Sequence, residues 1–244
     1  MKKQNLNNIY IISILLGIIN LGCSDIFDKS PLDAVSDGTF WNTESDADLA
    51  LIGCYDVNEG WGGEDFWVNR GLLFIDLAAG NGSEKENFTS SITDGTLNSS
   101  HWAMEAYWKH SYERIATCNN FLDNIGKIQM KDTKKNMMIS EIRTIRAYEY
   151  FNLGLYFGNV PLVEHVLTIE QANSVFQSTR DVIWAFAEKE LKESCEALPP
   201  SRPDSEQGRI TQAAALAILG RLQMAGKKWS DAAESYKKII DYNY

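Results

Sequence analysis

The chain is 244 residues long, with 44% hydrophobic and 23% charged residues. This length and composition predict an ordered globular fold with its own hydrophobic core, and they exclude a disordered or collagen-like chain. The formal net charge is −10, and an acidic surface repels phosphate groups, so we expect no nucleic-acid partner.

The amino terminus, residues 1–22, is predicted to be an export signal. Lys2 and Lys3 form its positive start, and the apolar run 9–19 has the length of a signal-peptide core. A stable transmembrane helix needs roughly 20 apolar residues, so a membrane-spanning anchor is the weaker alternative.

A cysteine follows this signal. Residues 21–23, LGC, look like the lipobox of bacterial lipoproteins, with Asn20 where an aliphatic residue is usual. We expect lipid attachment at Cys23; the alternative is ordinary cleavage beside an incidental cysteine. Two or three acyl chains anchor a protein stably, whereas one chain is marginal. Residues 23–37 are acidic and have little apolar surface to pack, so they are predicted to form a tether.

A folded helical domain is predicted over residues 38–244. Its first helix is expected to begin after Asn42 or Thr43 as the N-cap, because apolar residues recur at helical spacing from there to Tyr55. The aromatic pair at 40–41 is expected to pack against the first turn of this helix.

Residues 58–100 are predicted to be a long irregular insertion. Gly, Asn and Ser dominate it and helical periodicity is lost, except at 72–79, which is predicted to be one short helix or strand. Loops of this length in compact proteins are more often functional than accidental.

The insertion carries the predicted ligand-binding residues Trp61, Trp67, Asn69 and Arg70. Sugars have apolar C–H faces ringed by hydroxyl groups, so a sugar site needs exposed aromatic rings flanked by polar side chains. The alternative is that both tryptophans cover the helical core, as most aromatic residues do. Four other tryptophans lie at helical spacing and are predicted to pack in the core: Trp102, Trp108, Trp184 and Trp229.

Helical patterns resume after residue 100, so the predicted fold class is all-α. The predicted helices cover 102–125, 135–157, 179–198 and 209–240, the last divided in two at Gly226. The first two of these helices are candidates for a helix pair, although their spacing does not match the tetratricopeptide signature.

The final two helices resemble one degenerate tetratricopeptide repeat, best seen at 211–244. Gly220 and Ala232 are small residues at the positions where the repeat's helices cross closely, and Tyr236 is the aromatic residue that fills the gap. We therefore expect tetratricopeptide-like helix pairs.

Catalytic motifs are not recognisable in the sequence. His101, His110 and His165 are scattered, and the adjacent acids Glu64 and Asp65 rarely face each other as the two carboxylates of a glycosidase must. We predict a protein that is not an enzyme, with no catalytic residue, metal or cofactor.

Three cysteines follow Cys23 in the chain: Cys54, Cys118 and Cys195. Their spacing matches neither a zinc site nor a disulfide framework. We expect them to be buried in helices as small apolar groups. The alternative is that two of the three form one disulfide bond.

Three segments together resemble the SusD/RagB family of outer-membrane nutrient-binding lipoproteins: 23–51, 141–163 and 208–240. The resemblance implies a SusD-like α-α superhelix. Family members are usually much longer, so the chain is similar to their amino-terminal portion, with the carboxyl-terminal half absent.

The resemblance also implies a function and a location. It implies binding of oligosaccharides, or of peptides in some relatives, at the cell surface by a lipid-anchored outer-membrane protein. The implied partner is a SusC-like TonB-dependent transporter. The competing hypothesis is a tetratricopeptide lipoprotein that scaffolds envelope assembly, but such a scaffold has no need of the insertion at 58–100.

Overall fold

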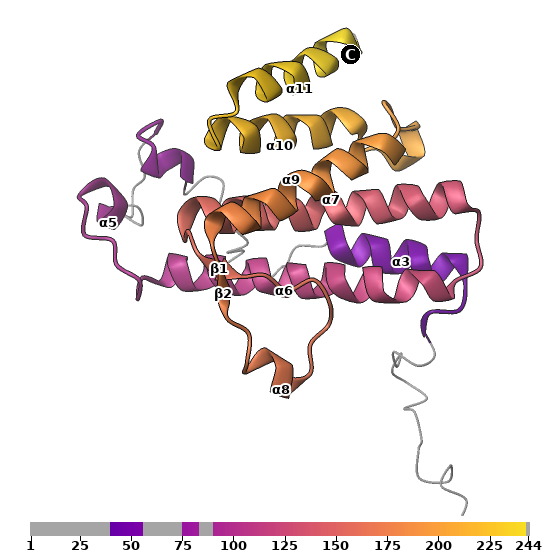
Figure 1. The fold of residues 1–244 in the computed structure, drawn as a ribbon, viewed down its shortest axis with the longest axis horizontal. Coiled ribbons are helices and arrows are strands. Elements are labelled where there is room, and N and C mark those ends of the chain that lie inside the picture. Colours follow the sequence, from indigo (N-terminus) through magenta and orange to yellow (C-terminus); the bar gives the residue numbers. More distant parts are fainter. Residues whose placement is uncertain (1–39, 56–74, 83–89, 243–244) are drawn as a thin grey trace, which may run out of the picture. The chain divides into compact units, whose positions relative to one another are not determined.

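The structure, a computed structural model, describes residues 40–55, 75–82 and 90–242. In these ranges it is mainly helical, which confirms the predicted all-α class (Figure 1). The predicted signal, Cys23 and the predicted tether lie outside the described residues. Within the described residues, none of the helices contains an apolar stretch long enough to cross a membrane.

Helix α3 (Glu44–Tyr55) begins at the predicted N-cap. The Thr43 hydroxyl oxygen accepts a hydrogen bond from the Asp46 N–H at 3.2 Å, and the Asp46 carboxylate accepts one from the Thr43 N–H at 2.7 Å. This reciprocal pair satisfies backbone donors that the first turn leaves free. Just before it, Trp41 is buried with its ring edge-on to Phe121, 5.8 Å between centroids.

Helices α6 (Trp102–Asn124) and α7 (Asp132–Tyr156) form the predicted helix pair, joined through the 3₁₀ turn Ile125–Lys127 (Figure 1). α7 contacts α3, α6, α9 and α10, and it buries side chains all along its length from Met138 to Gly154. A helix that is covered on most faces loses a clear amphipathic stripe. α7 is therefore the central helix of the packing.

Helix α9 (Arg180–Ala197) packs on α7, and α10 (Gln212–Ala225) and α11 (Trp229–Asp241) follow it (Figure 1). α10 ends at Gly226, as predicted. The core of the described residues runs between α6, α7, α9 and α10. Representative buried side chains, one from each helix, are Ile115, Leu153, Leu191 and Leu219.

The close crossing of α10 and α11 is confirmed. A Cβ atom added at Gly220 would lie 2.7 Å from the Tyr236 ring, so a glycine is needed there. A buried hydrogen bond of 2.8 Å from the Ser235 hydroxyl to the Gln223 side-chain oxygen joins the same two helices.

The sequence analysis did not predict several short elements. Strands β1 (Val160–Pro161) and β2 (Gln177–Ser178) pair antiparallel, and α8 (Ile169–Ala172) lies in the chain between them. We call residues 162–176 the α8 arm. The shortest elements have no measurable periodicity, so pattern analysis does not detect them. The remaining short helical elements of the described residues are 75–78, α5 (Ser90–Thr93) and the 3₁₀ turn Asp204–Glu206. The first of these confirms the short element predicted at 72–79.

The core prediction is wrong for two of the four tryptophans. Trp102 is 42% exposed and Trp229 is 62% exposed. Each is the first residue of its helix, so it lies at the helix end and outside the packed middle turns. Trp108 and Trp184 pack against the core and are partly buried.

The expected burial of the cysteines is confirmed. Cys54 and Cys118 are buried and Cys195 is partly buried.

Candidate functional site

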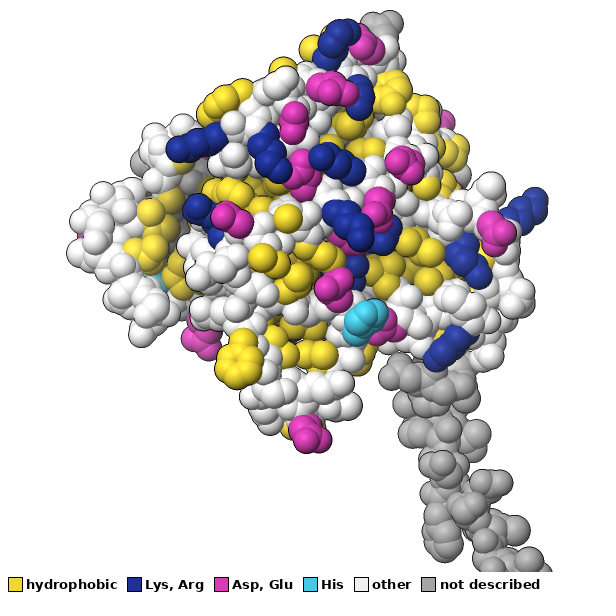
Figure 2. All heavy atoms as spheres, in the orientation of Figure 1, with side chains coloured by type: hydrophobic (Ala, Val, Ile, Leu, Met, Phe, Trp, Pro, Cys, Tyr) yellow, Lys and Arg dark blue, Asp and Glu magenta, His cyan; other side chains and the backbone are white. Residues whose placement is uncertain are grey.

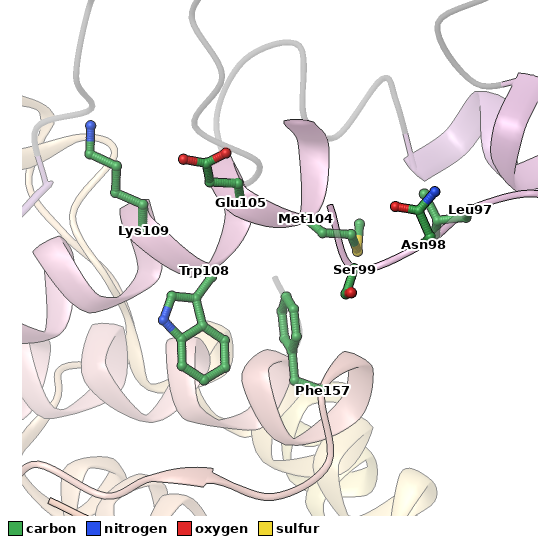
Figure 3. Close-up of a pocket in the computed structure, with 8 residues that line it drawn as sticks. All are labelled: Leu97, Asn98, Ser99, Met104, Glu105, Trp108, Lys109 and Phe157. Carbon is green, nitrogen blue, oxygen red and sulfur yellow. The ribbon is translucent and has the colours of Figure 1, made fainter. Parts of the chain in front are cut away.

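A groove of about 760 Å³ lies where the segment before α6 meets the end of α7 (Figure 3). Its lining combines large apolar side chains with polar groups, which is the usual composition of a small-molecule site. The lining residues are Leu97, Asn98, Ser99, Met104, Glu105, Trp108, Lys109 and Phe157.

Trp108 and Phe157 form the apolar wall. Their rings meet edge to face, 5.2 Å between centroids at an interplanar angle of 80°, a favourable aromatic geometry. Met104 lies one helical turn before Trp108 and extends the same wall. Figure 3 shows the two rings next to each other, with Glu105 and Lys109 extending away from them.

The end of α7 fixes the position of Phe157. This residue is the C-cap, and its N–H donates to the Leu153 carbonyl at 2.9 Å. Gly158 then adopts φ 75°, a left-handed conformation that favours glycine and terminates the helix. The Phe157 ring therefore has a defined place at the groove.

Two tyrosines contact the rings of this wall. Tyr107 is 2% exposed and contacts the Phe157 ring at 5.4 Å between centroids. Tyr112 contacts the Trp108 ring at 5.0 Å and donates its hydroxyl hydrogen to the Pro161 carbonyl at 2.8 Å. Burial raises the pKa of Tyr112 far above its ordinary value, so the hydroxyl stays protonated and keeps donating. The wall is thus held in place before any ligand arrives.

His101 attaches the segment before α6 to the helix. Its Nδ1 accepts from the Ala103 N–H at 3.2 Å, capping α6. The proton of a neutral ring then lies on Nε2, which donates to the Ser91 hydroxyl at 3.0 Å. This histidine thereby positions Asn98 and Ser99 at the groove.

Tyr55, the last described residue before the insertion, is held in place by hydrogen bonds. The Tyr55 hydroxyl, at the end of α3, donates to the buried Glu141 carboxylate at 2.6 Å. Arg202 and Arg209 bind the same carboxylate at 2.9 and 2.6 Å. The Ile210 N–H donates to the Tyr55 oxygen at 2.9 Å.

A second buried ion pair lies at the centre of the helix packing. Arg146 of α7 binds Glu190 of α9 at 2.6 Å. The same guanidinium donates to the Asn119 side-chain oxygen at 2.7 Å and to the Glu164 carbonyl at 3.0 Å. One side chain therefore connects α6, α7, α9 and the α8 arm.

The predicted ligand-binding residues Trp61, Trp67, Asn69 and Arg70 lie outside the described residues. The sequence analysis missed the groove because it assigned Trp108 entirely to the core, whereas Trp108 both packs on the core and lines the groove. A usable signal was the Met104–Trp108 spacing flanked by Glu105 and Lys109, since it places apolar and charged side chains on neighbouring turns.

The groove suits a ligand that has flat apolar faces and many hydroxyl groups. Trp108 and Phe157 offer ring surface, and Asn98, Ser99 and Glu105 offer hydrogen-bonding groups around it. Among the described lining residues Glu105 is the sole carboxylate.

Two curated relatives align with this chain over nearly its whole length. SusD-like protein P2 of Formosa agariphila is 24% identical over 255 residues, an alignment that covers 99% of this chain and 46% of the relative. The chain thus spans about half the length of the curated relatives it matches.

Solved structures share its fold. A SusD-like carbohydrate binding protein from Bacteroides fragilis is 36% identical with a TM-score of 0.74, over 83% of this chain and 41% of that one. A laminarin binding SusD-like protein is 25% identical with a TM-score of 0.69, over 81% of this chain and 43% of that one.

A SusD-like family model, described as starch-binding and associating with the outer membrane, matches residues 32–224. This match covers most of the chain. The chain belongs to the SusD-like family of outer-membrane-associated proteins.

Proposed function

We propose that the protein binds oligosaccharide or polysaccharide at the cell surface and delivers it to a SusC-like TonB-dependent transporter. The observation that carries the proposal is the groove, where Trp108 and Phe157 form an aromatic wall beside the polar groups of Asn98, Ser99 and Glu105. The names of the relatives, which include a laminarin binding protein, support the same class of ligand.

The proposal includes a second set of ligand contacts and an anchor. Trp61, Trp67, Asn69 and Arg70 belong to the insertion that joins α3 to α6, and they are proposed to extend the binding surface. Export through residues 1–22, lipid attachment at Cys23 and an acidic tether over 23–37 are proposed to hold the protein on the outer membrane.

The α8 arm supports the proposed contact with a transporter. Ile169 and Phe176 are 83% and 87% exposed, and Val166 is 55% exposed. Figure 2 shows hydrophobic side chains on the surface of this arm. Asp123 of α6 holds its base, accepting from the Val166 N–H at 2.9 Å and contacting His165 at 2.7 Å. Apolar groups held in solvent favour a protein partner.

Binding of the full chain to laminarin and other polysaccharides, by affinity electrophoresis and calorimetry, tests the ligand. We expect Trp108→Ala to weaken binding about fivefold or more, because an aromatic contact contributes about 1 kcal/mol. Trp229→Ala is the matched control, since this exposed indole lies outside the groove. Equal binding by both variants would reject the groove.

The double variant Trp61→Ala, Trp67→Ala tests whether the insertion contributes to ligand binding. Weaker retention on a polysaccharide gel with an unchanged unfolding temperature would support its role, and unchanged retention would reject it. Peptides in the same screen test the peptide-binding alternative. Protease treatment of intact cells tests the alternative of an envelope scaffold, because a surface protein is removed and a periplasmic one is kept.

A further inference from the structure

Two cysteines meet at the contact between α3 and α6. Cys54 and Cys118 are 1% and 0% exposed. The Cys54 thiol lies 3.7 Å from the Thr117 carbonyl oxygen, the group next to Cys118 in the chain. The Cys54 side chain also lies close enough to the Cys118 thiol to raise its pKa. The two sulfur atoms are therefore neighbours across the helix interface.

The surroundings limit what this pair can do. Contact with the Cys54 thiol and burial both raise the pKa of the Cys118 thiol well above its ordinary value. A protonated, buried thiol is a poor nucleophile and a poor metal ligand. The described residues contain no group of three or more side chains suited to holding a metal ion. Two neighbouring thiols can, however, be joined by a bond between their sulfur atoms in an oxidising compartment.

We propose that Cys54 and Cys118 form a disulfide bond in the exported protein. The oxidant is a donor disulfide acting by thiol–disulfide exchange. Before the folding chain buries the two side chains, one cysteine attacks the donor as its thiolate and releases one donor thiol, and the second cysteine then displaces the other donor sulfur. Both cysteine protons pass to the two released donor thiols, and the donor takes up two electrons. The proposal uses the proposed export, because disulfides persist outside the cytoplasm.

The cross-link would close a covalent ring containing residues 55–117. That ring holds the insertion, the residues that begin α6, and Trp108. Restricting so long a loop in the unfolded chain favours the folded state. We expect reduction of the bond to lower the unfolding temperature by about 10 °C.

Cys195 is the internal control. It lies on α9, and the groups that act on it electrostatically are Lys238 and Glu196 rather than another cysteine. We expect its thiol to remain free in the protein in which the other two are linked.

Peptide mapping tests the proposal on the full chain taken from the cell envelope. The protein is quenched in acid, alkylated in denaturant without reductant, and digested for mass spectrometry. We expect the Cys54 and Cys118 peptides to be joined and Cys195 to be alkylated. Alkylation of all three cysteines, also after incubation with oxidised glutathione in moderate urea, would overturn the proposal.

Thermal unfolding with and without reductant gives an independent readout. Reductant should lower the unfolding temperature of the wild type and of Cys195→Ala, and should have no effect on the double variant Cys54→Ala, Cys118→Ala. A reductant effect that persists in the double variant would also overturn the proposal. Neither arm depends on glycan binding, so failure here leaves the proposed ligand untouched.

Discussion

Gly220 of α10 lies directly against the ring of Tyr236 on α11, so close that a Cβ atom at this position would come within 2.7 Å of the ring. The contact allows the two helices to approach each other closely. Ala232, 3% exposed, packs in the same helix pair.

Substitution of this glycine should therefore destabilise the protein. We expect Gly220→Ala to lower the free energy of unfolding by about 1–3 kcal/mol, since the added methyl group overpacks the crossing. Gly53→Ala is the matched control, because a Cβ at this helical position meets no atom within 4 Å. It should raise the free energy of unfolding by about 0.5–1 kcal/mol. Urea unfolding of both variants measures these opposite changes in the free energy of unfolding. An equal change in the two variants would contradict the packing argument.

Replacing Arg146 of the buried Arg146–Glu190 pair should lower the free energy of unfolding strongly. Arg146→Met removes one of the two arginines that bind the buried Glu190 carboxylate and leaves Arg143 as its remaining partner. We expect a loss of up to about 3–5 kcal/mol in the free energy of unfolding. Lys237→Met removes an exposed pair with Asp241 and should change that free energy by less than about 1 kcal/mol. Denaturant titration measures both. A small effect at Arg146 would show that the other helix contacts suffice.

Glu188 predicts an acid-dependent loss of stability. Burial raises the pKa of this carboxyl, but hydrogen bonds from Lys192 and Lys228 outweigh it and hold the pKa below its ordinary value of 4.5. A group with a lowered folded-state pKa stabilises the protein above its ordinary pKa, and that contribution is lost as the pH falls below it. Stability measured between pH 6 and pH 3 should therefore decline less steeply in Glu188→Gln than in the wild type. Glu234→Gln, an exposed carboxyl, should keep the wild-type slope.

The α8 arm predicts a defect in partner binding without a defect in folding. If the proposed SusC-like transporter contacts this arm, Ile169→Ala with Phe176→Ala should reduce co-purification with it, because both side chains are exposed. For the same reason the unfolding temperature should stay within about 2 °C of the wild type. Ile240→Ala, 75% exposed on α11, is the control. An equal loss of co-purification in the control variant would reject the α8 arm as the contact surface.

The long helices could be predicted from sequence because each repeats its apolar pattern over several turns and most have a recognisable cap or terminator. Thr43 and Gly226 illustrate this, since both act locally. The exposure of Trp102 and Trp229 could not be predicted, because spacing along one helix does not reveal where its neighbours end.

The groove could be predicted only in part from the sequence, for a related reason. Trp108 and Phe157 belong to different helices, and their contact arises from the packing of α6 on α7. The meeting of Cys54 and Cys118 is likewise a tertiary contact. Local patterns predict helices, whereas sites depend on how helices are placed together.

The position of Phe157 at the last turn of α7 has a consequence for how ligand preference could diverge in this family. Each residue added to a helix rotates the next side chain by about 100° and advances it by about 1.5 Å. Lengthening or shortening α7 by one residue before Gly158 would turn the ring away from Trp108 and reshape the groove. A single insertion or deletion at a helix end, with every aromatic residue retained, would then be enough to change which ligand fits the groove.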